Sequence, residues 1–580
     1  MNDTLISLVE GFEEYLGDPH DRDNIFSFPR STELDRAEEF PDAICHQLNA
    51  WGLQRYYVPA PLEGALTTFE APFQLIRAVA RRDLTAAIGH GKTFLGGVCA
   101  WIVEPDNAVR SLARKVIEGY PVSWGLTERD HGSDLLAGEV KAEKISGKYR
   151  ITGEKWLINN ATRGRLVTVL ARSAPAGGAR GFDVFLVDKK QLPETAFRCL
   201  PKAHTHGIRG ADISGIRFDE AEVDLDSRLG SPGQGVETVL KSLQLTRTLC
   251  SSLSLGAGDH ALRLAVRFAQ ERSPHGHPLL QLPRARRILL DAFADHLLGE
   301  ALALIGVRSI HALTDEMSVT SAVVKYLVPS RTDATIEALA RLLGARSQLL
   351  DVFADGMFQK VQRDHRIVGV FDGNTLVNLS ALINEFPTIA RKSQADQGEA
   401  DLDGLFDMSR SVGTFDATEL SLVSRGGSSV IRELRRSVAR LTTLSAARMS
   451  LAPTAAQAQR VLARTDALLS EMAAHRPLRG KVPPRSFQVA REFSLCYAAS
   501  AAIGVWLANH ERMHDGPTGQ LWHNARWLQA ILGRVLTSLG IPVEHDPDSD
   551  QALLDTLLQQ QESGWSVSLV PHRVAEGIFA

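Results

Sequence analysis

Two short stretches of the 580-residue sequence carry side chains that could bind phosphate. The first is a polar loop, WGLTERDHGSD, in which Gly132 and Ser133 could offer a backbone N–H group and a hydroxyl. Most Gly-Ser-Asp tripeptides are simple turns, so this loop alone is a weak signal. The second is Glu271-Arg272, whose guanidinium could hold a phosphate bidentately or could equally lie on a solvated helix face. Neither stretch identifies a reaction by itself.

The cysteines do not suggest a metal site. There are five, and they are scattered without CxxC or other metal-type spacing: Cys45, Cys99, Cys199, Cys250 and Cys496. A sparse, odd set is typical of a reducing compartment and disfavours a disulfide framework. We therefore expect no bound metal.

The elements that must position these side chains fall into four regions. Residues 1–118 are predicted to be helical, because apolar residues recur at helical spacing. Residues 119–228 contain short segments rich in Val, Ile, Phe and Thr between turn residues, which predicts antiparallel strands. Residues 229–391 are helical again, and 405–580 form a further helical region after an expected linker at 392–404. This order predicts an α+β protein with four domains at these boundaries.

The composition excludes several classes of function. The net charge is -4, so there is no overall basic field for nucleic acid. The N-terminus is acidic and lacks the basic start of a signal peptide. No run of about 18 apolar residues suggests a transmembrane helix. We expect a cytoplasmic protein.

The loop TERDHGSD and the later segment GEKWLINNA together resemble the acyl-CoA dehydrogenase family. Members carry the motifs TEPxxGSD and GxKxWITN in a central β-domain. The matching residues here are Thr127, Glu128, Gly132, Ser133, Asp134, Lys155, Ile158 and Asn160. The resemblance implies that FAD is the cofactor. It also implies that FAD is contacted by Leu126, Thr127, Gly132 and Ser133, with Trp124 beside the flavin.

The second motif departs from the family pattern at two positions. The usual flavin-side Trp is Leu157, and the usual Thr that bonds flavin N5 is Asn159. Asn still offers a hydrogen bond, but Leu gives no aromatic stacking. We therefore expect FAD binding to persist while flavin tuning and reactivity toward oxygen change.

The second helical region resembles the family signature around an arginine and a later Glu-Arg pair. By this resemblance Arg247 lies near the acyl and pantetheine channel, and Arg272 reaches the FAD phosphates of a neighbouring subunit. His275 occupies the place of the usual Phe after that arginine. The adenine-side motif QxxGGxG keeps Gly344 but has Arg341 in place of Gln.

The segment FDGNT, 371–375, falls where the family has YEGT. There the Glu removes the α-proton of the acyl thioester, so the resemblance makes Asp372 the catalytic base. It places Phe371 and Gly373 against substrate, and Asn374 and Thr375 against the cofactor. A carboxylate suits this role because burial strengthens it as a base. Asp is one methylene shorter than Glu, and the alternative is that Asp372 is only a turn residue.

The resemblance implies a reaction and its partners. It is FAD-dependent α,β-dehydrogenation of an acyl-CoA or an acyl-carrier-protein thioester, with an electron-transfer flavoprotein as acceptor. One alternative is an oxidase or other oxygen-using flavoenzyme on the same fold, which the DGNT sequence favours. Another is a non-catalytic homologue that binds a thioester or a partner protein. The extra C-terminal helices resemble those of very-long-chain dehydrogenases and acyl-CoA oxidases, which favours a homodimer.

Overall fold

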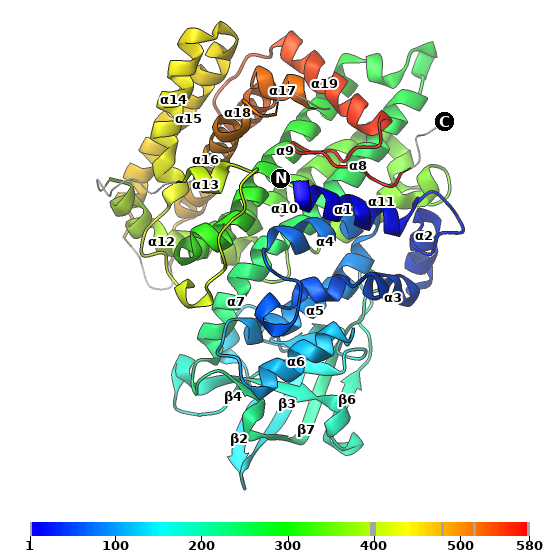
Figure 1. Cartoon of the computed structure of the whole chain (residues 1–580), viewed down its shortest axis with the longest axis vertical. Coiled ribbons are helices and arrows are strands. Elements are labelled where there is room, and N and C mark those ends of the chain that lie inside the picture. Colours follow the sequence, from blue (N-terminus) through cyan, green and yellow to red (C-terminus); the bar gives the residue numbers. More distant parts are fainter. Residues whose placement is uncertain (1–2, 395–401, 477–480, 514–517, 577–580) are drawn as a thin grey trace.

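The computed structural model describes residues 3–394, 402–476, 481–513 and 518–576. A β-sheet occupies one end of the molecule, and helices form the remainder (Figure 1). Helices precede the sheet and follow it along the chain, which confirms the predicted α+β class.

The last two of the six N-terminal helices lie next to the sheet, and the others lie beside the helices that follow the sheet in the chain (Figure 1). The six are α1 (Asp3–Leu16), α2 (Phe28–Ala37), α3 (Asp42–Trp51), α4 (Glu70–Arg82), α5 (Leu84–Trp101) and α6 (Asn107–Ile117). Helix α5 begins where the Asp83 carboxylate accepts hydrogen bonds from the backbone N–H groups of Thr85 and Ala86. Every α5 residue from Leu84 to Ala100 is buried, so α5 is a central helix.

The sheet has eight strands in the order β6-β7-β3-β2-β4-β5-β8, with β1 paired to β4. They are β1 (Val122–Gly125), β2 (Lys141–Ile145), β3 (Lys148–Asn159), β4 (Leu166–Arg172), β5 (Phe182–Asp188), β6 (Phe197–Leu200), β7 (Ile213–Asp224) and β8 (Arg228–Leu229). Most pairs are antiparallel, as predicted, but β1 and β2 each pair with β4 in parallel. The parallel pairing of β1 with β4 is possible because β2, β3 and their loops form a long crossover between these two strands.

Alternation along β4 gives the sheet two covered faces. Leu166 and Leu170 point into the main helical core, whereas Val167, Val169 and Ala171 belong to a second core inside the β-domain. This period of two follows from the strand pleat. The β-domain is therefore anchored to the helices through one face and closed by its own side chains on the other.

A close contact between α5 and the sheet fixes their relative position. A Cβ atom on Gly96 would lie 2.6 Å from the carbonyl oxygen of Val122 in β1, so only glycine allows this approach. The Gly96 carbonyl accepts a hydrogen bond of 2.8 Å from the Thr168 hydroxyl in β4. These contacts of Gly96 with β1 and β4 bring α5 close to the loop that follows β1.

A second set of helices follows the sheet along the chain. It consists of α7 (Gly235–Leu249), α8 (Ser251–Glu271), α9 (Pro283–Ala312), α10 (Met317–Leu343), α11 (Met357–His365) and α12 (Thr375–Gln394). Of this set, α7, α8 and α11 contact α5. Helices α8, α9 and α10 pack on one another, and α4 packs on α8. The N-terminal and central helices thus share one core.

The C-terminal helices extend that core away from the sheet (Figure 1). They are α13 (Asp403–Phe406), α14 (Ser429–Ala447), α15 (Ala452–Ala474), α16 (Pro484–Asn509), α17 (Gly519–His523), α18 (Arg526–Ser538) and α19 (Pro547–Glu562). The side chains of Trp506, Trp522 and Trp527 are fully buried among them, and burial of a large apolar side chain stabilises by roughly 1.5–3 kcal/mol. The expected linker at 392–404 overlaps the end of α12 and the start of α13, and 395–401 lie outside the described residues.

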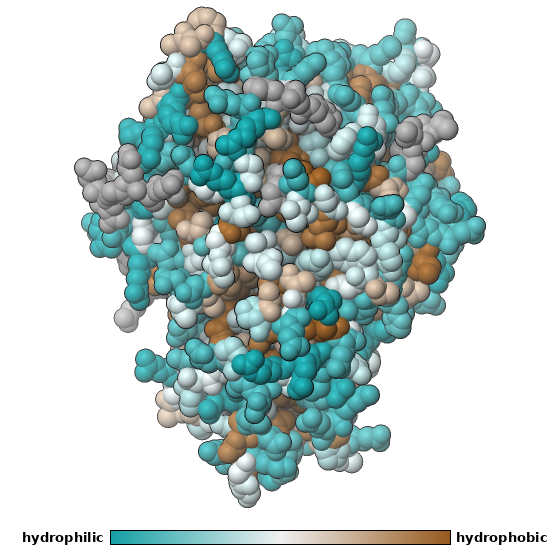
Figure 2. All heavy atoms as spheres, viewed as in Figure 1, coloured by the Kyte–Doolittle hydropathy of each residue, from teal (hydrophilic) through white to brown (hydrophobic). Residues whose placement is uncertain are grey.

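The face shown in Figure 2 is largely hydrophilic, and its apolar areas are separated by polar ones. Among the described residues, no helix is both long and apolar enough to cross a membrane.

Candidate active site

Asp372 lies in a tight turn between α11 and α12. Its φ is 56° and that of Gly373 is 103°, so two consecutive residues adopt the left-handed region. Asp tolerates this conformation better than most residues, and glycine adopts it freely. Such backbone strain outside glycine occurs often at functional sites.

The sequence after Asp372 fixes this turn at the start of α12. The Asn374 side chain accepts a hydrogen bond of 3.0 Å from the Val377 N–H group, as an N-cap does. The Asn378 amide donates to the carbonyl oxygens of Gly373 and Asn374, each at 2.9 Å. Asn374 and Thr375 therefore lie beside Asp372, and Asn374 has a clear structural role.

Three helices bring cationic side chains to Asp372. Lys92 from α5 places its Nζ atom 3.4 Å from both carboxylate oxygens. Arg247 from α7 donates through Nε to the Asp372 carbonyl oxygen at 2.8 Å. Lys325 from α10 donates to the carbonyl oxygens of Val368 at 2.7 Å and Gly373 at 3.3 Å. The turn is thus held through its backbone as well as through its carboxylate.

Burial governs the protonation of this cluster. It lowers the pKa of Lys325 to about 8 and lowers the pKa of Arg247 below its ordinary value. Cys250, at the start of α8, places its Sγ atom 3.4 Å from the Asp372 carboxylate. Burial raises the pKa of this thiol to about 12, so it is neutral at physiological pH. The side chain of Asp372 is 11% exposed, so it is not fully shielded from solvent.

The TERDHGSD loop follows β1 and is tied to β3 by a buried ion pair. Lys155 donates to the Glu128 carboxylate at 2.8 Å and to the Leu126 carbonyl oxygen at 3.0 Å. Burial alone would raise the pKa of Glu128, but the Lys155 ammonium and two backbone N–H groups lower it overall. The Thr127 hydroxyl donates to the Trp156 carbonyl oxygen at 2.7 Å. Glu128 of the first motif and Lys155 of the second therefore hold the loop in place.

The far part of this loop is open to solvent. Gly132 and Ser133 are exposed, and a Cβ atom on Gly132 would meet nothing within 4 Å. The half-buried Trp124 and Leu126 lie at its base and pack against the helical core. The loop thus runs from the core to the surface, as a binding loop for an elongated ligand would.

Strand β3 ends in an irregular segment that contains Leu157 and Asn159. Its pairing with β7 shifts register between Trp156 and Ile158, and Leu157 has a φ of 57°. This β-bulge turns an aliphatic side chain outward with 45% of its surface exposed. Leu157 thus combines an exposed apolar side chain with a backbone conformation that costs energy, and such strain occurs often at functional sites.

An unpaired acceptor supports a flavin site beside this bulge. The Oδ1 atom of Asn159 is buried and has no hydrogen-bond partner among the described residues. Buried polar atoms in native proteins nearly always have partners, so a ligand is expected here. The polar edge of a flavin would supply one, and the residues present fit the FAD that the resemblance implies.

Four predicted cofactor residues lie away from Asp372. Arg272 and His275 are exposed after the end of α8, and Gly344 is exposed after α10 with a φ of 59°. Arg341 is also exposed and pairs with Glu337 one helical turn away at 2.8 Å. The single chain does not bring these side chains to the other predicted residues, so their assignment to a neighbouring subunit's FAD stays a prediction.

Three members of the cluster were missed by sequence reasoning: Lys92, Cys250 and Lys325. None belongs to a motif. The one available signal is that each lysine interrupts a long apolar helix segment, GHGKTFLGG or SAVVKYLVP. A charged residue buried in such a segment needs a partner or a function.

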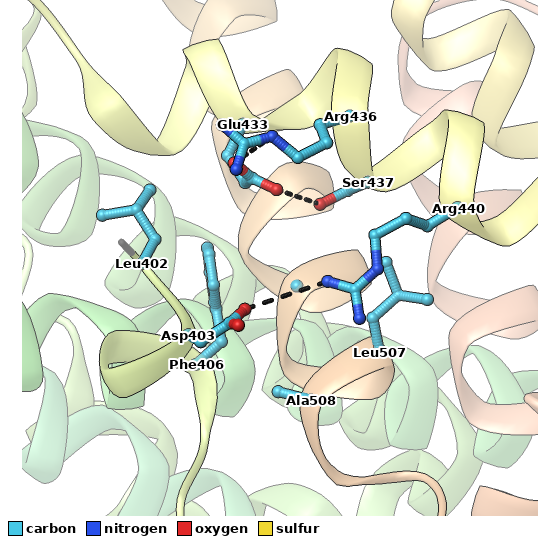
Figure 3. A pocket seen from close by; sticks show the side chains of 10 residues that line it. Leu402, Asp403, Phe406, Glu433, Arg436, Ser437, Arg440, Leu507 and Ala508 are labelled. Carbon is cyan, nitrogen blue, oxygen red and sulfur yellow. Dashed lines mark hydrogen bonds and ion pairs between the residues drawn. The ribbon is translucent and has the colours of Figure 1, made fainter. Parts of the chain in front are cut away.

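A separate pocket of about 320 Å³ lies among the C-terminal helices α13, α14 and α16 (Figure 3). The charged groups at its edge pair with each other: Arg440 with Asp403 at 3.8 Å, and Arg436 with Glu433 at 3.5 Å. The described residues contain no cluster of His, Cys, Asp and Glu suited to a metal ion.

The sequence matches two family domains in the order of the fold. Residues 123–221 match the acyl-CoA dehydrogenase middle domain, and residues 233–385 match the acyl-CoA dehydrogenase C-terminal domain. The first match covers nearly all of the sheet, and the second covers the helices that supply Arg247 and Lys325 and the turn that holds Asp372.

Individual proteins give the same result. "Probable acyl-CoA dehydrogenase fadE25" of Mycobacterium leprae is 27% identical over 264 residues, which are 45% of this chain and 67% of that protein. The human mitochondrial short-chain specific acyl-CoA dehydrogenase is 25% identical over 358 residues, 60% of this chain and 83% of that protein. The structure of butyryl-CoA dehydrogenase from Megasphaera elsdenii superposes with a TM-score of 0.59 at 19% identity, covering 66% of this chain and 97% of that one. The chain belongs to the acyl-CoA dehydrogenase superfamily, whose members are oxidoreductases that act on CH–CH bonds.

Proposed function

We propose that the protein catalyses FAD-dependent dehydrogenation of an acyl thioester between its α and β carbons, giving the 2-enoyl thioester. The observation that supports this most directly is the position of Asp372. Its carboxylate is held in a strained turn among three helices, on the family motif, with limited exposure. The named activities of the relatives, including butyryl-CoA dehydrogenation, point to the same reaction.

Asp372 would act as the base that takes the α-proton. The α-proton of a thioester is weakly acidic, so a positioned carboxylate is needed in a site that excludes most water. Arg247 would hold the base in position, because it binds the Asp372 backbone carbonyl rather than the carboxylate. Lys92 would favour charge that develops on the thioester oxygen, since an ammonium fixed beside the reacting atoms requires no rearrangement.

The remaining predicted residues would hold the cofactor. We assign Trp124, Leu126, Thr127, Gly132, Ser133, Leu157, Asn159, Asn374 and Thr375 to FAD within one chain. We assign Arg272, His275, Arg341 and Gly344 to the FAD of a partner chain in a homodimer. When bound, FAD supplies the acceptor for the hydride that leaves the β-carbon.

We infer that the acyl group is carried by CoA or by an acyl carrier protein in the cytoplasm. Electrons would pass to an electron-transfer flavoprotein. An oxygen-using variant of the same reaction is the second candidate. It is favoured by Leu157, which leaves an exposed aliphatic side chain where the family has an aromatic one.

The experiment that tests the proposal is an anaerobic titration of the purified protein with acyl-CoAs of graded chain length. We expect the protein to carry FAD and its visible flavin absorption to bleach with one class of thioester. A protein that cannot be reconstituted with FAD would refute the proposal. If FAD is bound but neither a CoA thioester nor a carrier-protein thioester reduces it, the hypothesis of a non-catalytic homologue would be favoured. Peroxide formation on readmission of air would identify the oxidase.

A further inference from the structure

Three side chains at the end of α11 form a chain of hydrogen bonds. His365 is the last residue of α11, and its Nδ1 atom lies 2.6 Å from the carboxylate of Asp333 in α10. Its other ring nitrogen, Nε2, lies 2.9 Å from the Ser254 hydroxyl in α8. Both ring nitrogens therefore have a partner, whichever tautomer the ring adopts. One imidazole thus joins three helices.

This Ser–His–Asp set is not placed as a hydrolytic triad. Ser254 and His365 are both 0% exposed, so the serine hydroxyl cannot meet a substrate. Asp333 reaches solvent, and its side chain is 40% exposed. Loss of either partner would leave a buried polar atom of the ring without a hydrogen bond, which costs free energy. The set therefore fixes the chain at His365 instead of attacking a ligand.

Residues 365–373, here called the base turn, follow directly and are bonded to one another. The His365 carbonyl oxygen accepts a hydrogen bond of 2.9 Å from the Val368 N–H group. The Ile367 carbonyl oxygen accepts one of 2.9 Å from Val370. Because these bonds tie the segment together, we expect a shift at His365 to move the carboxylate that the turn carries.

Helix α10 holds the base turn at both ends. Lys325 donates to the Gly373 carbonyl oxygen at 3.3 Å, and Asp333 bonds the ring of His365. Lysine and aspartate lie two steps apart on one i±4 ridge of the helix. Between these ends, a Cβ atom on Gly369 would lie 3.9 Å from the Asp333 carboxylate. The base turn therefore runs along the surface of α10.

Helix α8 repeats this arrangement from another side. The Cys250 thiol lies 3.4 Å from the Asp372 carboxylate, and Ser254, one helical turn later, contacts His365. Residues four apart share a face of a helix, so α8 also reaches both ends of the base turn. The position of Asp372 thus depends on contacts at His365 as well as on its own.

We propose that His365 and Asp333 are positioning residues, which set where the Asp372 carboxylate stands relative to a bound thioester. This rests on the proposed function, because it takes Asp372 as the base. Both residues act through the base turn and not on the substrate. The effect on rate can be large, since a displacement of about 1 Å can cost about 100-fold.

Asp333→Ala is the variant of choice, because this side chain is partly exposed and its loss leaves the buried ring in place. The backbone amides of the base turn should exchange their hydrogens at least about tenfold faster, because a weakened anchor lets the turn open more often. The measurement is hydrogen–deuterium exchange by mass spectrometry on the FAD-loaded protein.

The matched control is Asp466→Ala in the C-terminal helices. Asp466 is 44% exposed and pairs with Arg435 at 2.8 Å, so the same substitution removes a similar contact far along the chain. It should leave exchange in the base turn unchanged. Exchange that is equal in the wild type and in Asp333→Ala would overturn the proposal.

A positioning role also separates rate from binding. In single-turnover flavin reduction, Asp333→Ala should lower the limiting rate at least about tenfold and keep the Kd of the thioester within about twofold. Asp333→Glu retains the carboxylate and should recover most of the lost rate. Weaker binding of FAD or thioester at an unchanged limiting rate would show a purely structural role and overturn the proposal.

Exchange and reduction together distinguish this inference from the proposed function. Flavin reduction at the same limiting rate in the wild type and in Asp333→Ala would keep the function and reject the positioning role. If no thioester reduces the wild type although exchange is faster in Asp333→Ala, the proposed reaction is rejected. In that case the pair still anchors the turn, but Asp372 is not a base for it to position.

Discussion

Two buried groups of charged residues in this protein differ in their balance. The cluster at Asp372 sets three cations against one carboxylate. A second group, here the tail network, joins the C-terminal segment 565–576 to α1, α4, α8 and α9. It has four arginines and four carboxylates: Arg77, Arg81, Arg82, Arg263, Glu13, Asp259, Glu300 and Glu576.

The tail network is closed by direct ion pairs. Arg81 bridges Glu13 at 2.7 Å and Glu576, and Arg263 pairs with Glu576 at 2.9 Å. Arg77 pairs with Glu300 at 2.5 Å. Burial would raise the pKa of Glu576, but the neighbouring arginines lower it far below its ordinary value.

Nearby histidines do not alter this balance. Burial lowers the pKa of His260 to about 3 and that of His572 to about 4, so both are neutral at physiological pH. The tail network can therefore be explained by folding alone, because every charge has a partner inside the chain. The cluster at Asp372 differs, because Arg247 and Lys325 bond to backbone carbonyl oxygens and not to carboxylates.

The largest expected effect on stability comes from removing one carboxylate from the tail network. Glu576→Gln should destabilise the protein by about 3–5 kcal/mol, because it leaves Arg81 and Arg263 with an uncompensated buried charge. The measurement is the free energy of unfolding in urea.

The matched control is Glu471→Gln, the same substitution in the exposed pair with Arg485 at 2.7 Å. Exposed pairs contribute about 0–1 kcal/mol, so this variant should unfold much like the wild type. Equal stability of Glu576→Gln and the control would contradict a structural role for the tail network.

Removal of a cation from the cluster at Asp372 should change the free energy of unfolding by a smaller amount and in the opposite direction. Lys325→Met should stabilise the ligand-free protein by about 1 kcal/mol, because relief of the buried charge outweighs the two lost hydrogen bonds to carbonyls. A clear loss of stability would mean that Lys325 is already balanced without ligand.

In the wild-type protein, the destabilising effect of the buried Lys325 charge should appear as a pH dependence of the free energy of unfolding. Lys325 has a pKa of about 8 when folded and 10.5 as its ordinary value, so the unfolded chain binds more protons between these values. The loss of the Lys325 proton should therefore raise the free energy of unfolding between about pH 8 and pH 10.5. Below pH 8 Lys325 is charged, and the full destabilising effect of its burial should be present. In Lys325→Met this part of the rise should be missing from urea unfolding curves.

Much of the fold was predictable because local patterns agree with it. The β4 segment LVTVLAR and the β5 segment FDVFLVD show the length and composition of strands, and the Ala/Leu-rich segments around them form the predicted helices. The parallel pairing of β1 was not predicted, because pairing depends on distant segments rather than on strand composition.

The site was predictable only where it coincides with motifs. Asp372, Arg247 and the loop at Thr127 were found through family resemblance. Lys92 and Lys325 were not, because each is a single charge in an apolar helix and lies far in the sequence from Asp372. The tail network was missed for the same reason, since Glu13 and Glu576 lie at opposite ends of the chain.

The central claim is that Asp372 is the base, and the measurement that tests it most directly is single-turnover flavin reduction in Asp372→Asn. The thioester is the one that reduces the wild type fastest, under anaerobic conditions in a stopped-flow instrument. We predict that FAD stays bound and that the reduction rate falls at least about 100-fold, as for loss of a general base. Reduction at the wild-type rate would contradict the claim and make Asp372 a turn residue.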